Sequence, residues 1–305
     1  MKVSVIGAGN VGGTLAQRIA EADLADVVLL DIAEGIAKGK GLDLSDARYV
    51  TGHNRKILGT SDYNAISDSA VVVVTAGLAR KPGMTRADLL QKNALIIKTV
   101  INSIIGKAPD SIILMVTNPL DILTNLAIKW SKFSSRQVIG MGGVLDSARF
   151  ANLIAEYLDV PVTSVDAMVI GAHSKDMIPL TGMAKVSGKL LSDIVSGEVC
   201  SKLSLATSER GAQIVVNLGQ GSAYYAPSAA AFRMVKAIIK DEKAIVPACV
   251  YCQGEYSIED ACIGVPVKIG ASGVEEIIEL EISAEDKEKL INCAQSVKKA
   301  AANLL

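Results

Sequence analysis

The 305-residue sequence has no long apolar run and almost no net charge. No stretch reaches the ~18 apolar residues of a membrane-spanning helix, so we expect no membrane association. The 31 basic and 32 acidic residues give a net charge of −1, which argues against general binding to nucleic acid or anionic membranes. A strand pattern begins at residue 2 and leaves no room for a signal peptide, so we predict a cytoplasmic protein.

Cysteine and histidine are both scarce. The chain has two histidines and five cysteines, an odd number that favours reduced thiols. Cys249 and Cys252 form a C-x-x-C pattern, which is compatible with a redox site or half a zinc site. The surrounding segment AIVPACVYC is typical of a strand, in which this odd spacing places the two thiols on opposite faces. There is no second C-x-x-C and no nearby histidine pair, so we predict buried structural cysteines and no metal site.

Residues 2–31 contain the most informative pattern in the chain. A strand pattern over 2–6 is followed by a G-x-G-x-x-G loop, a helical pattern over 10–22 and a second strand over 26–30. The first glycine allows a tight turn, the second lets the backbone approach a pyrophosphate, and the third lets the helix lie close to the strand. The loop residues are Gly7, Ala8, Gly9, Asn10, Val11 and Gly12. The pattern predicts dinucleotide binding, and the alternative is a glycine-rich turn in another α/β unit.

The identity of the dinucleotide depends on Asp31, which ends the second strand 19 residues after Gly12. A carboxylate here can accept hydrogen bonds from both ribose hydroxyls of an adenosine, whereas it would repel a 2′-phosphate. The N-terminus of the intervening helix provides free N–H groups for the phosphates. We therefore predict NAD as the cofactor.

The chain divides into two regions of different pattern. Residues 1–143 alternate strands and helices, which predicts a doubly wound parallel sheet of the Rossmann type that binds NAD. Residues 144–305 mix helices with short and antiparallel strands, which predicts an α+β substrate domain. No linker rich in proline or glycine separates the two, so we expect them to pack closely. We expect strands at 2–6, 26–30, 56–59, 70–75, 112–117, 137–140 and 162–170, helices at 10–22, 34–46, 88–106, 119–130, 146–158, 189–196, 201–217, 223–240 and 284–303, and a hairpin of 245–252 with 261–269.

Cationic and polar residues follow two of the predicted parallel strands. Arg80, Lys81 and Arg86 follow the strand at 70–75, and Asn118 follows the next strand. Ligands of this fold class bind at the carboxyl ends of the strands. We therefore expect these side chains to gather at a ligand-binding edge of the sheet.

The two histidines are predicted to have different roles. His53 lies in the polar segment TGHNR and is expected to be a solvated side chain. His173 follows an apolar strand pattern in the second region. Asp146 and Arg149 lie three apart on one face of a predicted helix, so they can act together. Together with the arginine-rich loop of the first region, Asp146 and Arg149 make His173 a candidate catalytic residue.

Several segments, in this order along the chain, resemble the lactate/malate dehydrogenase family of 2-hydroxy acid dehydrogenases. The resemblance is closest to the lactate-dehydrogenase-like malate dehydrogenases. The matching segments are GAGNVG, VVLLDI, ARKPGMTRADLLQKN, VTNPLD, GMGGVLDSARF, GAHSKDMIPL and GVPVKIG, which span residues 2–270. Their order and spacing are far more specific than any one segment alone.

The resemblance implies a role for each matching residue. His173 is the general base toward malate and the general acid toward oxaloacetate, and Asp146 stabilises its imidazolium. Arg86 polarises the reacting carbonyl, while Arg149 and Arg80 bind the two substrate carboxylates. Asn118 is implied to contact the substrate as well as the cofactor. The implied cofactor contacts are Gly7, Ala8, Gly9, Asn10, Val11, Gly12, Asp31, Asn93, Val116, Thr117 and Asn118.

General chemistry independently supports these roles. Removing a hydride from an alcohol carbon requires a base for the hydroxyl proton, and an imidazole near its working pKa suits that task. A neighbouring carboxylate fixes the imidazole tautomer, and planar guanidinium groups bind carboxylates in a bidentate manner. The nicotinamide carries the hydride chemistry, so the protein has to supply position and electrostatics.

Arg80 is predicted to select the substrate. The resemblance implies a neutral glutamine at this position in lactate dehydrogenases and an arginine in malate dehydrogenases. A desolvated arginine that lost its carboxylate partner would cost roughly 2–5 kcal/mol. We therefore predict an NAD-dependent malate dehydrogenase that prefers oxaloacetate to pyruvate. The alternatives are a lactate or other 2-hydroxy acid dehydrogenase and a dinucleotide-binding protein without activity.

One segment departs from the family pattern. Gly-Asp commonly follows the catalytic histidine in the family, but Ser174 and Lys175 stand at these positions here. The imidazole is implied to pair with Asp146, so we expect activity to survive. The family also implies malate and oxaloacetate as substrates, a place in the tricarboxylic acid cycle, and a homodimer or homotetramer.

Overall fold

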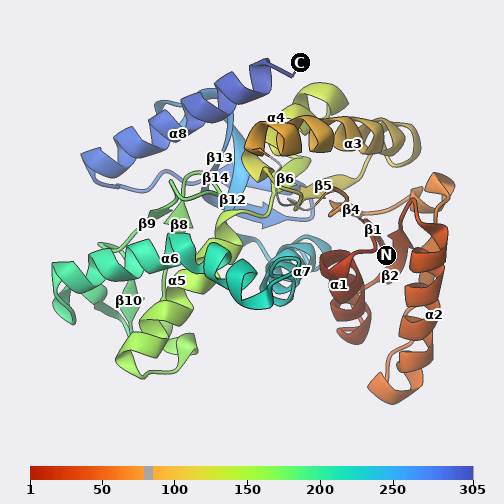
Figure 1. Ribbon diagram of the computed structural model, residues 1–305, viewed down its shortest axis with the longest axis horizontal. Helices are drawn as coiled ribbons and strands as arrows, with labels where there is room; N and C mark the ends of the chain where they lie inside the picture. Colours follow the sequence, from red (N-terminus) through yellow and green to blue (C-terminus); the bar gives the residue numbers. More distant parts are fainter. Residues whose placement is uncertain (79–84, 305) are drawn as a thin grey trace.

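The computed structural model describes residues 1–78 and 85–304, apart from the side chain of Arg86. Six parallel strands form one part of a nine-stranded sheet (Figure 1). They are β1 (Lys2–Ile6), β2 (Asp26–Leu30), β3 (Ile57–Thr60), β4 (Val71–Val74), β5 (Ile112–Met115) and β6 (Val138–Gly140). Their spatial order, β3-β2-β1-β4-β5-β6, is that of a doubly wound dinucleotide-binding sheet. The predicted fold class is confirmed.

Helices cover both faces of this parallel sheet (Figure 1). In the described part of the chain, the helices, including those away from this sheet, are α1 (Asn10–Glu21), α2 (Glu34–Thr51), α3 (Arg86–Lys107), α4 (Leu120–Ser131), α5 (Gly143–Leu158), α6 (Gly197–Leu218), α7 (Tyr225–Ile239) and α8 (Ala284–Ala302). Leu15 of α1 and Val235 of α7 belong to the buried cluster on one face. Ile101 of α3 and Leu123 of α4 belong to the cluster on the other face. β4 consists of four valines because its side chains alternate between the two clusters.

The same sheet continues into the second half of the chain. β12 (Ala244–Gln253), β13 (Glu259–Gly270) and β14 (Gly273–Ile277) are antiparallel, and β12 joins the edge of β6 where Cys249 faces Gly140. The predicted hairpin and the predicted close packing of the two regions are therefore confirmed. In the part of the chain that the structure describes, no helix has the length and hydropathy of a membrane crossing.

Two sequence predictions in the second region are wrong. Residues 189–196 were expected to be helical, but they form β11 followed by a 3₁₀ turn. Ser187 and Gly188 both have positive φ angles, of 49° and 83°, and make the tight turn that returns the chain from β10 to β11. Residues 162–170 form a 3₁₀ turn and two short strands instead of one strand. The short elements are β7 (Val165–Asp166), β8 (Val169–Ile170), β9 (Ile178–Pro179), β10 (Lys185–Val186) and β11 (Lys189–Leu190), with 3₁₀ turns at Tyr63–Ile66, Val162–Ser164, Leu191–Asp193 and Glu255–Ser257.

The structure confirms the prediction for the C-x-x-C cysteines and contradicts the prediction for His53. Cys249 and Cys252 are both buried free thiols, and they belong to clusters on opposite faces of the sheet, as predicted. The prediction of a solvated His53 is wrong, because its side chain is buried with 6% exposure. Gly52 ends α2 in a left-handed conformation (φ 75°) and turns the chain inward, so that the His53 Nδ1 accepts a hydrogen bond from the Arg55 N–H.

A network of charged side chains joins α4, β12, β13 and α8. Lys129 of α4 donates hydrogen bonds to the Tyr251 hydroxyl and to the Asp260 carboxylate. Tyr251 also donates to Asp260, and Lys298 of α8 lies 3.4 Å from the same carboxylate. Hydrogen bonds from Lys129 and Tyr251 lower the pKa of Asp260 to about 2. Because this folded-state pKa lies below the ordinary value, ionised Asp260 stabilises the fold at neutral pH and loses that effect as the pH falls toward 2.

Replacing Asp260 with asparagine is therefore expected to lower the melting temperature near neutral pH by about 2 °C. Asparagine keeps the tolerance for the positive φ of 63° at this position and removes only the charge. The difference from the wild type should be smaller at about pH 3, where the wild-type carboxylate contributes less. Thermal melts followed by circular dichroism check this, with the exposed Asp193→Asn as control. An equal difference at both pH values would contradict the electrostatic explanation.

Candidate active site

The loop between β1 and α1 has the backbone geometry that the glycine pattern predicts. Gly7 has a φ of 107°, and a Cβ on it would lie 2.7 Å from the Ala76 nitrogen. A Cβ on Gly12 would lie 1.9 Å from the Gly7 carbonyl oxygen, so only glycine lets α1 approach the loop. A Cβ on Gly9 would meet no atom within 4 Å, so the backbone faces open space there. The loop thus fits a dinucleotide, whose phosphates can approach Gly9 and the N-terminus of α1.

Asp31 lies beside this loop at the end of β2. Its Oδ2 accepts a hydrogen bond from the Ala8 N–H at 2.7 Å, and its Oδ1 accepts one from the Ala33 N–H at 2.9 Å. These two bonds hold the half-exposed carboxylate next to the glycine-rich turn. The position fits the predicted contact with an adenosine ribose, which stays a prediction.

Lys40 is a residue of this region that the sequence reasoning missed. Its amine crosses from α2 and donates hydrogen bonds to the carbonyl oxygens of Ala8 and Gly9, at 2.8 and 3.1 Å. A Cβ on Gly13 would lie 3.3 Å from the Lys40 Nζ, so the small residue leaves room for the lysine. The first turn of α1 has no acidic residue, and the cation therefore stands unopposed by a carboxylate of that turn. This arrangement places a positive charge beside the glycine-rich loop.

Asn93, Thr117 and Asn118 organise the ends of β4 and β5. Asn93 is fully buried, and its Nδ2 donates to the Asn118 carbonyl at 2.8 Å while its Oδ1 accepts from the Leu78 N–H at 2.8 Å. The Thr117 hydroxyl donates to the Ala76 carbonyl at 2.7 Å. In this structure Asn93 and Thr117 therefore hold the backbone, whereas the Asn118 side chain is exposed and lines a cavity. Half-buried Val116 lies between the end of β5 and Thr117.

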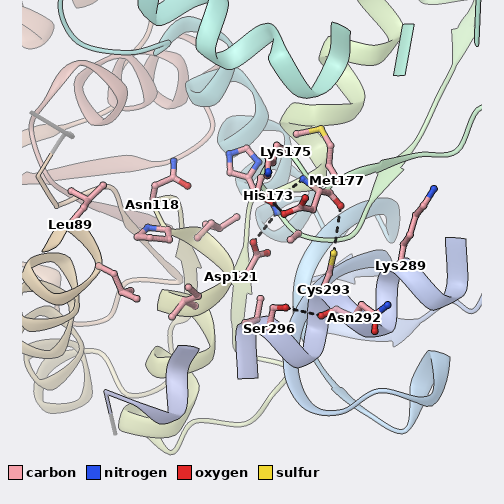
Figure 2. A pocket seen from close by; sticks show the side chains of 18 of the residues that line it. Leu89, Asn118, Asp121, His173, Lys175, Met177, Lys289, Asn292, Cys293 and Ser296 are labelled. Carbon is pink, nitrogen blue, oxygen red and sulfur yellow. Dashed lines mark hydrogen bonds between the residues drawn. The ribbon is translucent and has the colours of Figure 1, made fainter. Parts of the chain in front are cut away.

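A cavity of about 1000 Å³ opens at this edge of the sheet (Figure 2). Its walls come from the beginnings of α3 and α4, from the loop between β8 and β9, and from one side of α8. His173 lines it together with Asn118 and Asp121, although His173 lies 52 positions after Asp121 in the sequence. Of the residues predicted to gather at this edge, Asn118 lines the cavity. Arg80 and Lys81 lie outside the described residues, and the side chain of Arg86 is not described, so their positions stay predictions.

The central pair of the site is His173 with Asp146. The His173 Nδ1 lies 2.7 Å from the Asp146 Oδ2, and the histidine side chain is 13% exposed. Asp146 is buried in the first turn of α5. Burial opposes a charge on the imidazole, but the carboxylates of Asp146 and Asp121 together outweigh it, and the pKa of His173 is raised. With Nδ1 held by the carboxylate, Nε2 is the nitrogen left to exchange a proton with a ligand.

Arg149 lies on the other side of the same carboxylate. Its Nη1 is 3.3 Å from the Asp146 Oδ1, and a Cβ on Gly211 of α6 would lie 3.4 Å from Nη1. Among the described residues, no partner accepts a hydrogen bond from the buried Nε of Arg149. Burial lowers the pKa of this guanidinium, although Asp146 acts in the opposite direction. A largely buried guanidinium with unused donors can bind a carboxylate ligand.

The side chains of the two arginines that the first region is predicted to contribute to the substrate site are not described by the structure. Arg80 lies outside the described residues, and Arg86 begins α3 but its side chain is not described. α3 starts there because the Thr85 hydroxyl accepts from the Asp88 N–H at 3.1 Å, while the Asp88 carboxylate accepts from the Thr85 N–H at 3.0 Å. Their substrate contacts stay predictions.

The segment that departs from the family pattern forms a tight turn. The Ser174 hydroxyl accepts a hydrogen bond from the Asp176 N–H at 3.1 Å, and the Met177 N–H donates to the Ser174 carbonyl at 3.2 Å. Lys175 is exposed on this turn and lines the cavity. With Ser174 and Lys175 at these positions, the neighbouring His173 is paired with Asp146.

Asp121 is a second residue that the sequence reasoning missed. It lies in the first turn of α4 and is buried, and its Oδ2 accepts a hydrogen bond from the His173 N–H at 2.8 Å. The one signal in the sequence is an acidic residue directly after TNPL at the start of an otherwise apolar helix. That signal gives no indication that His173 would lie opposite.

Two family models match the chain and together span nearly all of it. The model for the NAD binding domain of lactate/malate dehydrogenase matches residues 1–140. The model for the alpha/beta C-terminal domain of lactate/malate dehydrogenase matches residues 143–304.

Individual relatives are similar over their full length. A malate dehydrogenase of Methanosarcina barkeri is 49% identical over 303 residues, which cover 99% of both chains. The solved malate dehydrogenase of Salinibacter ruber is 43% identical with a TM-score of 0.95, over 100% of this chain and 97% of that chain. A lactate dehydrogenase of Cryptosporidium parvum, solved with lactic acid and nicotinamide adenine dinucleotide, is 37% identical with a TM-score of 0.96, over 99% and 97% of the chains.

Proposed function

The chain belongs to the lactate/malate dehydrogenase family, and on that premise we propose that it is an NAD-dependent malate dehydrogenase. It interconverts (S)-malate and oxaloacetate with NAD and NADH. The observation that carries this most directly is the buried His173–Asp146 pair beside a cavity at the edge of a dinucleotide-binding sheet. The malate dehydrogenases at 43–49% identity favour this substrate.

In malate oxidation, neutral His173 accepts the hydroxyl proton of the substrate at Nε2. Asp146 stabilises the resulting imidazolium through Nδ1 and keeps the ring in the reactive tautomer. In oxaloacetate reduction, the protonated ring returns the proton to the carbonyl oxygen. When bound, NAD supplies the hydride acceptor for the reaction, and NADH supplies the donor.

The remaining residues are proposed to bind and orient. Arg149 binds the carboxylate next to the reacting carbon, and Arg80 binds the distal carboxylate. Arg86 polarises the reacting carbonyl, and Asn118 contacts both ligands from the cavity wall. Asp31 binds the adenosine ribose. We propose that residues 1–143 hold NAD and that residues 144–305 supply most of the substrate site.

The proposed function is tested by following NADH absorbance with oxaloacetate and pyruvate in parallel, then repeating both assays with NADPH. Fast turnover of oxaloacetate with NADH alone is the expected result. Efficient turnover of pyruvate would favour lactate dehydrogenase activity, which the structural similarity to a lactate dehydrogenase makes the second candidate. Cofactor binding without turnover of either substrate would indicate a dinucleotide-binding protein that lacks activity.

Lys40 is proposed to support the cofactor site by holding the glycine-rich loop and adding a positive charge there. Lys40→Met is expected to raise the KM for NADH roughly three- to tenfold, because one hydrogen-bonded contact contributes about 0.7–1.4 kcal/mol at a partly exposed site. The kcat with oxaloacetate should change much less. Steady-state kinetics check this against Lys38→Met, which removes an exposed lysine of α2 that pairs with Glu34. Equal KM values for the two variants would contradict the role of Lys40.

We also propose a cytoplasmic homodimer or homotetramer that acts in the tricarboxylic acid cycle. The proposal of self-association is supported by family membership and by large apolar side chains that α2 exposes, such as Leu42, Tyr49 and Val50. Multi-angle light scattering measures the mass in solution. A monomer at the working concentration would contradict this proposal without affecting the assignment of the reaction.

A further inference from the structure

The cavity wall contains a buried carboxyl group that the reaction scheme has not used. Asp121 projects from the first turn of α4 toward the backbone of His173, as Figure 2 shows. Its Oδ2 accepts the His173 N–H at 2.8 Å, and among the described residues its Oδ1 has no hydrogen-bond partner. Asp146, by contrast, uses one oxygen for His173 and the other for Arg149.

A buried carboxyl group in this position lowers the stability of the fold, so a structural role alone does not explain it. Burying a charged group without full compensation destabilises a protein, and an unpartnered buried oxygen is uncommon in native structures. Asparagine would accept the same backbone N–H without a charge. What aspartate adds is a negative charge, and the group close to it that changes charge during the reaction is the His173 imidazole.

Several titratable groups lie close to the Asp121 carboxyl and affect its charge. Among the described residues, the titratable groups that face its carboxyl are His173 from the loop after β8, Cys249 from β12, Asp146 from α5 and Cys293 from α8. Burial raises the pKa of Asp121, and the His173 charge, the His173 N–H and the Cys249 thiol act in the opposite direction. Asp121 in turn raises the pKa of His173, by less than Asp146 does, while burial and the charge of Arg149 lower it.

We propose that Asp121 is a second carboxyl that positions His173 through its backbone N–H and favours the protonated form of its imidazole. The inference rests on the proposed function, in which His173 is the group that exchanges the proton. Asp146 contacts the imidazole ring directly. Asp121 lies in the cavity wall and accepts a hydrogen bond from the backbone of the loop that carries the ring. Asp121 is thus a positioning residue that adjusts the pH range of both reaction directions.

The test compares Asp121→Asn with the wild type in pH profiles of kcat/KM. Asparagine can still accept the His173 N–H, so the variant removes mainly the charge. Malate oxidation needs neutral His173, and its acid limb should move to lower pH. Within that limb, activity relative to the plateau should rise roughly three- to tenfold. Oxaloacetate reduction needs protonated His173, and its alkaline limb should move to lower pH as well. Asp193→Asn, which removes an exposed carboxylate, should leave both limbs in place.

A second measurement separates this inference from the proposed function. The chain has only two histidines, so the NMR signals of the His173 imidazole can be followed directly and assigned with His53→Gln. The titration midpoint of His173 should fall in Asp121→Asn even if the assay conditions support no turnover. Asp121→Ser provides a smaller uncharged variant if the asparagine variant folds poorly. Unchanged NMR midpoints in a folded variant, or unchanged pH limbs, would overturn the role of Asp121. Failure of the wild type with malate and oxaloacetate would overturn only the proposed function.

Discussion

Replacing His173 with glutamine is expected to lower kcat about 10³-fold in both reaction directions. Glutamine can hydrogen-bond near Asp146, but it cannot take up or release a proton at the working pH. The loss should fall on kcat, because the glycine-rich loop and Asp31 lie apart from the imidazole and the variant leaves them intact. Steady-state assays with oxaloacetate and malate measure the loss, and NADH fluorescence measures whether the cofactor still binds.

The matched control is His53→Gln, which makes the same substitution at the other histidine. His53 is buried beside the end of α2 and does not line the candidate active-site cavity. Its replacement should lower the melting temperature and leave kcat close to that of the wild type. If His173→Gln kept more than about a tenth of the wild-type kcat, the imidazole would not be the proton-exchanging group.

Replacing Arg80 with glutamine is expected to reduce the preference for oxaloacetate over pyruvate by roughly 10²-fold or more. This follows from the roughly 2–5 kcal/mol that separates a paired from an unpaired desolvated charge. The neutral amide no longer pairs with the distal carboxylate of oxaloacetate and no longer disfavours the methyl group of pyruvate. Arg80 lies outside the described residues, so this prediction comes from the sequence and the family. The ratio of kcat/KM values for the two substrates measures the effect.

Two further variants separate charge, geometry and position in this segment. Lys81→Gln removes the adjacent cation and should leave the substrate preference close to that of the wild type. Arg80→Lys keeps the charge but loses the planar pair of donors, so an intermediate preference is expected. An Arg80→Gln variant with the wild-type preference would show that another group recognises the distal carboxylate.

The local features of the fold could be predicted because they depend on neighbours in the sequence. The turn at Gly7 and the close approach at Gly12 follow from backbone sterics, and both are observed. The buried valines of β4 and the hairpin of β12 with β13 follow from hydrophobic patterning. Prediction failed at residues 189–196, where apolar residues at helix-like spacing form β11 and a 3₁₀ turn, directly after the tight turn at Ser187 and Gly188.

The His173–Asp146 pair could be anticipated only with the family pattern, because its members are 27 residues apart and lie on different elements. The pairing of Asp146 with Arg149 was simpler to anticipate, since an i, i+3 spacing on a helix brings them together. The burial of His53 could not be anticipated, because it depends on how the end of α2 packs against β3 and not on the polarity of its neighbours.

The sequence by itself indicated the glycine-rich cofactor-binding unit, the doubly wound parallel sheet and the candidate proton-exchanging residue, since each depends on short patterns with strong steric or chemical requirements. Only the tertiary structure decided the pairings of His173 with Asp121 and of Lys40 with the loop carbonyls. These contacts join residues separated by 52 and by 31 or 32 positions, respectively. No periodicity or spacing rule connects positions so far apart, because their proximity arises when the helices pack onto the finished sheet.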